Sequence, residues 1–141
     1  MTVDYILSNP AKRLLTFKDN NWIHSDLNSC SPLAMAKAGF FAVSKDCAVC
    51  HYCKKELDFW EANDIPWEEH KSHNSECPFI KYYASPPDQV LVVDALKLER
   101  DRLVYMMTQE HKKTVVELEK HQEVAKNTFE TKRKRGRARK F

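Results

Sequence analysis

The chain has 141 residues, of which 43% are hydrophobic and 30% are charged, so it has room for one compact domain and an appended segment. No apolar run approaches the roughly 18 residues of a membrane-spanning helix, and the first residues lack the apolar stretch of a secretion signal. A membrane-spanning or secreted protein is therefore not expected. Five cysteines, an odd number, in the reducing cell interior indicate metal ligands or free thiols rather than disulfides.

The formal net charge of +3 is unevenly distributed. Seven of the nine residues from Lys132 to Lys140 are Lys or Arg, whereas the segment 44–78 has a net charge of −4. An acidic segment favours basic or amine-bearing partners, and a basic one favours nucleic acid, acidic lipid or a transport receptor. The two regions are expected to have different roles.

Two helices are predicted before residue 40. Ser8 and Asn9 precede Pro10, which suits the first turn of a helix. Ser31 and Pro32 repeat this cap pattern, and Gly39 marks the point where the chain leaves the second helix. The segment 19–30 between them is typical of a loop.

Three short strands and a further helix are predicted next. Residues 40–43 and 47–52 are strand-like, and a third run, 56–59, follows the turn between Cys50 and Cys53. Two strands joined by a Cys-x2-Cys turn are a common way to present two thiolates to one metal. A helix opening at residues 64–66 carries both His70 and His73.

A long amphipathic helix is predicted after the break at residues 84–88. Neither Pro nor Gly occurs from Gln89 to about Thr131, and about 40 residues would extend roughly 60 Å. An apolar seam recurs at spacings of seven, three or four, which favours packing against partner helices. The seam comprises Leu96, Leu103, Met107, His111, Val115, Leu118, Gln122, Ala125 and Phe129, and the polar His111 and Gln122 interrupt it. The predicted partner interface is Leu96, Leu103, Met107, Val115 and Leu118.

Seven side chains could ligate a metal, namely Cys47, Cys50, His51, Cys53, His70, His73 and Cys77. Cys50-x2-Cys53 is the anchor, because this spacing lets two thiolates take adjacent tetrahedral corners. By spacing alone, the second pair could be His70 with Cys77 or His73 with Cys77, and Cys47 with Cys50 is a rival first pair. A Cys3His set leaves no position for water, so it predicts a closed structural zinc site.

Catalysis is not expected. Neither the H-x-E…P-C-x-x-C pattern of zinc deaminases nor the H-E-x-x-H pattern of metalloproteases occurs, and no catalytic residue is proposed. Cys30 and Cys47 are expected to be free thiols. The chain is predicted not to be an enzyme.

Five motifs together resemble the baculoviral IAP repeat (BIR) family. They occur in the order Arg13-x2-Thr16-Phe17, Met35–Phe41 (MAKAGFF), Cys50-x2-Cys53, Trp60 and His70-x6-Cys77. The resemblance covers about residues 10–80 and implies one structural zinc held by Cys50, Cys53, His70 and Cys77. It also implies an α+β fold with a three-stranded antiparallel sheet and short helices over 5–87. The long helix would occupy 88–131. The basic tail 132–141 is predicted to be disordered for a separate reason, because its like charges repel one another and it offers no apolar face.

A single BIR module before a long helix, without a RING finger, resembles the survivin-like branch of the family. This implies a chromosomal passenger complex subunit that binds borealin-like and INCENP-like helices and brings an Aurora-type kinase to centromeres. The implied locations are the nucleus, centromere, spindle midzone, midbody and cytoplasm. A homodimer of the free chain is also implied, although residues 88–93 are aliphatic where the branch is partly aromatic. The basic tail is not a shared feature of the family, and its charge predicts nuclear entry, non-specific chromatin contact or a solubilising role.

The resemblance also implies a groove for the phosphorylated N-terminal tail of histone H3. Asp58 and Asp64 would hold the terminal ammonium, Trp60 would admit Ala, and Leu57 would lie on the strand edge that pairs with the peptide. Lys55 and His73 would meet the phosphate on the third residue. Without the resemblance, Trp60 reads as a core residue and the acids as solvated. The alternative function is an apoptosis inhibitor that binds proteases or Ala-beginning antagonist peptides in the same groove.

Overall fold

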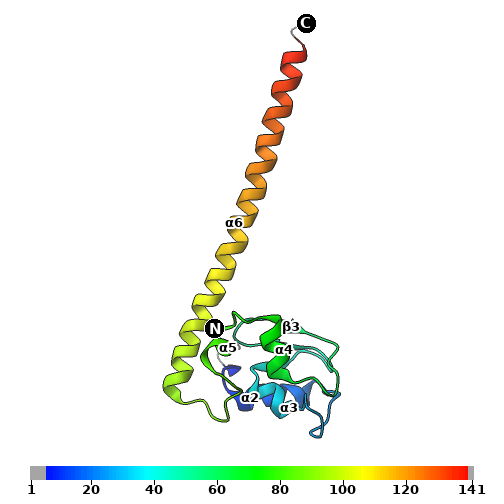
Figure 1. Cartoon of the computed structure of the whole chain (residues 1–141), viewed down its shortest axis with the longest axis vertical. Helices are drawn as coiled ribbons and strands as arrows, with labels where there is room; N and C mark the ends of the chain where they lie inside the picture. The colour runs from blue at the N-terminus through cyan, green and yellow to red at the C-terminus, as the bar shows by residue number, and fades with distance from the viewer. Residues whose placement is uncertain (1–5, 140–141) are drawn as a thin grey trace. The chain divides into compact units, whose positions relative to one another are not determined.

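The computed structural model describes residues 6–139 and contains a three-stranded antiparallel sheet, short helices and one long helix, α6 (Figure 1). The strand order is β1-β2-β3. The predicted α+β class, with its three strands and long helix, is confirmed.

The first two helices begin at the caps that the sequence indicates. In α2, Pro10–Asp19, the Asn9 side chain accepts a hydrogen bond from the backbone N–H of Ala11 at 2.9 Å. In α3, Pro32–Lys37, the Ser31 hydroxyl accepts from the backbone N–H of Ala34 at 3.3 Å. Each cap satisfies an N–H that has no partner inside its helix.

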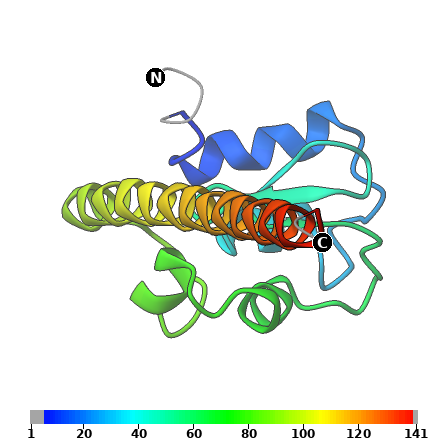
Figure 2. The same cartoon turned by 90° about the horizontal axis from the view of Figure 1, so that it is seen from above.

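The sheet places its small and aromatic residues toward the core. Strands β1, Phe40–Ala42, and β2, Ala48–Cys50, pair with Phe40 opposite Cys50, and β3, Glu56–Leu57, pairs with β2 so that Leu57 lies opposite Ala48. Alternate residues of β1 and β2 are buried, as expected for a sheet with one covered face. In the view of Figure 2, α2 (blue) lies on one side of the strands and the green helices α4 and α5 lie on the other.

Two further helices complete the module. Helix α4, Pro66–His73, was predicted, whereas the short α5, Pro78–Tyr82, was not. Helix α5 contributes Phe79, which is fully buried and stacks on Tyr52 with a centroid distance of 4.5 Å and an interplanar angle of 2°. The Trp67 ring of α4 packs edge-on against the Phe79 ring, with a centroid distance of 5.7 Å.

Gly39 lies between α3 and β1 at φ +95°, a backbone conformation that L side chains rarely adopt. An added Cβ would lie 3.2 Å from Phe79 Cδ1 and 3.5 Å from Tyr52 Cδ2. We expect Gly39→Ala to lower the free energy of unfolding by about 1–3 kcal/mol through backbone strain and crowding. Urea titration followed by tryptophan fluorescence measures this change.

Gly136→Ala is the matched control, because nothing lies within 4 Å of a Cβ added there. It should leave the midpoint of the urea titration unchanged, because all three tryptophans that report unfolding lie in the module. Equal midpoints for Gly39→Ala and the native chain would contradict the assigned backbone conformation.

The first turns of α6, Val92–Ala138, are docked on the module. Leu98 is fully buried, and Arg102 is 6% exposed and bonded to Glu99 at 2.6 Å. Tyr82 Oη donates to Asp94 at 2.5 Å, which raises the pKa of Tyr82 to about 12. The first of two compact units therefore extends to Tyr105, and Met106 begins the second.

The limits of α6 differ from those predicted. The helix begins at Val92 rather than near residue 88 and continues to Ala138, so residues 132–138 are helical and not disordered. Lys and Arg are good helix formers, and cations are favourable near a helix C-terminus, which offsets their mutual repulsion. Residue 5 and residues 140–141, at the outer limits of the predicted domains, lie outside the described part of the chain. Among the described helices, none is both long and apolar enough to cross a membrane.

Candidate functional site: a Cys3His metal centre

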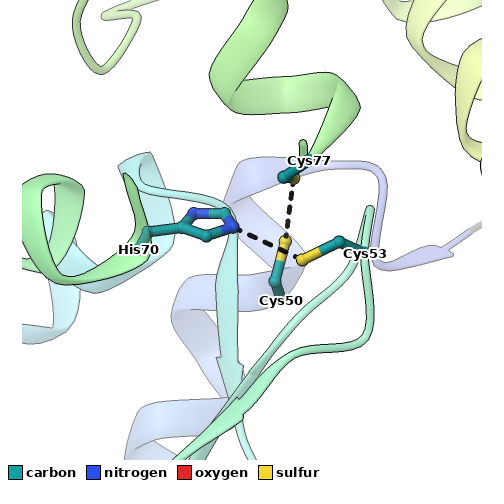
Figure 3. Close-up of side chains that lie close together, drawn as sticks. All are labelled: Cys50, Cys53, His70 and Cys77. Carbon is teal, nitrogen blue, oxygen red and sulfur yellow. Dashed lines mark hydrogen bonds between the residues drawn. The ribbon is translucent and has the colours of Figure 1, made fainter. Parts of the chain in front are cut away.

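Four buried side chains from separate parts of the module converge in one place (Figure 3). Cys50 ends β2 and Cys53 lies in the turn that follows it, while His70 comes from α4 and Cys77 precedes α5. The turn is closed by backbone bonds from Lys54 N–H to the Cys50 carbonyl and from Cys50 N–H to the Lys55 carbonyl, both at 2.9 Å.

The spacing of the ligand atoms fits a tetrahedral zinc ion. The Sγ atoms of Cys50 and Cys77 are 3.9 Å apart, and Sγ of Cys53 is 3.5 Å from Nε2 of His70. With Zn–S near 2.3 Å and Zn–N near 2.05 Å, tetrahedral geometry requires about 3.8 Å between sulfurs and about 3.6 Å between sulfur and nitrogen. All four ligand atoms lie within 4.8 Å of one another.

A backbone carbonyl sets the tautomer of His70. Its Nδ1 lies 2.8 Å from the carbonyl oxygen of Ala38, the C-cap residue that follows α3. Because a carbonyl only accepts, Nδ1 carries the proton and the lone pair of Nε2 is directed at Cys53. Metal-ligating histidines are typically oriented by such a bond from their second nitrogen.

The electrostatics of the cluster suit a bound cation. Burial, together with the neighbouring Cys53 and Cys77, raises the pKa of Cys50 well above its ordinary value. Hydrogen bonds from Cys50 and Cys77 lower the pKa of Cys53. Buried neighbouring thiols resist further ionisation, and a divalent cation removes that penalty.

The alternative ligands lie outside the cluster. The Cys47 thiol lies 3.4 Å from Glu56 Oε1, and burial followed by that contact raises its pKa to about 11. His73 is about half exposed and lies 3.5 Å from Glu69 on the same helix. The structure thus favours Cys50 with Cys53 over Cys47 with Cys50, and His70 over His73.

The predicted peptide-binding residues lie along β3 and the segments after it. Lys55 and Asp58 are exposed and Leu57 is partly buried on the edge strand. Asp64 accepts from the backbone N–H of Glu61 at 2.8 Å. Trp60 is only 5% exposed, which makes it chiefly a core residue.

Trp60 is held by contacts on several sides. Its indole N–H donates to the Leu57 carbonyl at 3.0 Å, and its ring packs edge-on against Phe40 at 5.4 Å. Little of the indole is therefore open to a peptide bound beside it.

Sequence reasoning missed two residues, His24 and Cys30, that hold the backbone at Trp60 and Glu61 in place. His24 Nε2 lies 2.7 Å from the Trp60 carbonyl, and the Cys30 thiol donates to the Glu61 carbonyl at 3.1 Å. Both come from the segment 19–30, for which the sequence predicts a loop and a free thiol at Cys30. No local pattern signals them, because their partners are backbone atoms more than 30 residues away.

The predicted seam of α6 is exposed. Leu98 and Arg102 face the module, whereas Leu96 and Leu103 lie roughly opposite at about 100° per residue and are 64% and 50% exposed. Further along the helix, Met107, Val115 and Leu118 are exposed as well.

Comparison with known proteins decides the family. A family model described as "BIR: Inhibitor of Apoptosis domain" matches residues 13–81. The Baculoviral IAP repeat-containing protein 5 of Rattus norvegicus is 33% identical over 122 residues, which cover 84% of each chain. The chain belongs to the BIR family. Its single BIR and long helix make it survivin-like, and its Cys3His cluster fits the structural zinc site of a BIR domain.

Two other relatives extend the comparison. The protein of the same name from Cavia porcellus is 39% identical over 94 residues, and the alignment spans 64% of either chain. The "Chromosomal passenger complex protein bir-1" of Caenorhabditis elegans is 28% identical over 109 residues, which cover 77% of this chain and 70% of the relative. The 122-residue match to the rat protein is longer than the BIR segment itself, so the likeness extends beyond the metal module.

Proposed function

We propose that the chain is a non-enzymatic subunit of a chromosomal passenger complex, acting in chromosome segregation and cytokinesis. The observation that carries the proposal is an exposed apolar seam on a helix joined to a BIR module, in a chain that resembles a worm protein named for that complex. The proposed locations are the nucleus, centromere, spindle midzone and midbody, with a cytoplasmic pool.

In this proposal one zinc ion has a structural role. Cys50, Cys53, His70 and Cys77 would fill its tetrahedral shell, which leaves no position for a reacting water. When bound, the ion supplies folding free energy, and the chain's own residues supply the partner surfaces.

The long helix would form a bundle with one borealin-like and one INCENP-like helix. Leu96, Leu103 and Met107 keep half or more of their surface exposed, and a continuous strip of this kind favours association. The INCENP-like partner would connect the complex to an Aurora-type kinase.

The module would bind the phosphorylated N-terminal tail of histone H3. β3 has an open edge that could pair with an extended peptide. Asp58 and Asp64 supply carboxylates for the terminal ammonium, and Lys55 and His73 supply cations for the phosphate. Trp60, where it borders the groove, would limit the first side chain to one as small as Ala.

Titration with three tail peptides tests the groove. We expect the phosphorylated peptide to bind most tightly, the unphosphorylated one about tenfold more weakly, and the N-acetylated one not measurably, because acetylation removes the ammonium. His73→Ala should abolish the preference for phosphate while leaving zinc content unchanged. Isothermal titration calorimetry measures both.

Lys71→Ala is a matched control, because Lys71 is an exposed cation on the same helix that is not assigned to the groove. It should leave the preference for phosphate in place. Equal affinity for all three peptides would overturn the histone-reading role.

The second candidate is an apoptosis inhibitor, favoured by the description of the matching family model. It would use the same groove for proteases or for antagonist peptides that begin with Ala. Tight binding of unphosphorylated Ala-beginning peptides, with no gain from phosphate, would favour this alternative.

A further inference from the structure

The basic segment 132–139, which comprises the end of α6 and the residue after it, has a charge that the proposed function does not use. Its six described cations are Lys132, Lys134, Arg133, Arg135, Arg137 and Arg139, all exposed. The last acidic residue before them is Glu130, and within the described residues none of the six forms an ion pair. The segment is therefore an uncompensated concentration of positive charge.

The helix distributes this charge around its whole circumference. The backbone is helical through Ala138, and each residue turns the helix by about 100°, so Lys132 to Arg135 already point to all sides (red end of α6 in Figure 1). A helix is about 10–12 Å across, close to the roughly 12 Å width of the major groove of duplex DNA. Inside that groove, cations on both flanks of the helix would meet the phosphates of both strands.

The composition of the segment disfavours other polyanions. Residues 130–140 include no Leu, Ile, Val, Met, Phe, Trp or Tyr, whereas a helix that lies on a membrane needs an apolar face. Duplex RNA presents a deep and narrow major groove that does not admit a helix. Duplex DNA is the polyanion that the charge and shape fit.

We propose that residues 132–139, the end of α6 and the residue after it, form a binding site for the phosphate backbone of duplex DNA, independent of the peptide groove and of sequence. Contacts to phosphates carry no sequence information by themselves. Six neutralised phosphates give an expected slope of about −5 in a plot of log K against log salt.

Fluorescence anisotropy of the full chain with a 20-base-pair mixed-sequence duplex tests the site. The triple variant Lys132→Gln, Arg133→Gln and Arg135→Gln should weaken binding at least about tenfold and reduce the salt slope by about 3. The matched control, Lys112→Gln, Lys113→Gln and Lys120→Gln, removes the same charge from an earlier part of α6 and should change Kd less than about threefold. Equal binding by the two triple variants would overturn the site.

Variants at Gly136 test whether DNA binding requires the helix or only the positive charge. Gly136→Pro breaks the helix without changing its charge and should weaken binding, whereas Gly136→Ala favours the helix and should preserve it. Equal affinities for these two variants would overturn the major-groove mode. A duplex RNA of the same sequence and vesicles of phosphatidylserine with phosphatidylcholine provide two further comparisons, and binding to either as tight as to DNA would overturn the assignment to DNA.

Discussion

Cys53→Ser or His70→Ala is expected to yield a chain whose module does not fold and does not retain zinc. Structural zinc supplies about 10–16 kcal/mol of apparent binding free energy in small zinc modules, which is as large as the whole stability of a typical domain, about 5–15 kcal/mol. The ligands come from β2, the turn after it, α4 and the start of α5, so losing one releases several elements. Metal analysis together with circular dichroism and dispersion of amide resonances measures the outcome.

Cys47→Ser is the matched control for this experiment. Cys47 is three residues before Cys50, but its thiol contacts Glu56 and not the cluster. Zinc content and folding should both be preserved. A well-folded native chain without zinc would falsify the structural role, and loss of zinc from Cys47→Ser would mean that the ligand set is wrong.

Leu103→Glu with Met107→Glu is expected to abolish binding of the partner helices while zinc content stays intact. Each large apolar side chain contributes roughly 1.5–3 kcal/mol when fully buried, and each Glu would add the cost of burying a carboxylate. Leu103 and Met107 are one turn apart and 50% and 73% exposed, so the change should not disturb the module. Co-purification with borealin-like and INCENP-like helices, followed by mass measurement of the complex, provides the readout.

Gln109→Glu with Lys112→Glu is the control for the seam. These residues lie about 120–180° around α6 from Leu103 and Met107, at about 100° per residue, and receive the same two carboxylates. Binding should be preserved in this variant. If the Leu103 and Met107 variant also binds both partners, the seam is not the interface.

Much of the fold was predictable because its signals are local. Asn9 and Ser31 both cap helices as their position before a proline indicates, and the Cys50-x2-Cys53 turn joins two strands. The spacing of residues in the sequence could not decide whether His70 or His73 is the ligand, because the Ala38 carbonyl orients the His70 imidazole. Only the family resemblance pointed to it beforehand.

The structure differs from the sequence-based predictions where interactions between distant residues decide the outcome. The compact unit reaches Tyr105 because Leu98 is buried on the module and Asn74 donates to Tyr105 Oη at 3.0 Å. The basic end is helical because it continues a helix that is already nucleated, where adding a residue costs far less than starting a turn. Burial of Trp60 reflects packing against Phe40, a partner 20 residues away.

The most direct test of the proposed function is affinity purification from dividing cells of the full chain and of a chain that stops after Tyr105, where the first compact unit ends. The full chain should recover borealin-like and INCENP-like proteins and an Aurora-type kinase, whereas the truncated chain should retain zinc and recover none of them. Recovery of the same partners by both chains, or of proteases in place of the kinase by the full chain, would contradict the passenger-complex account.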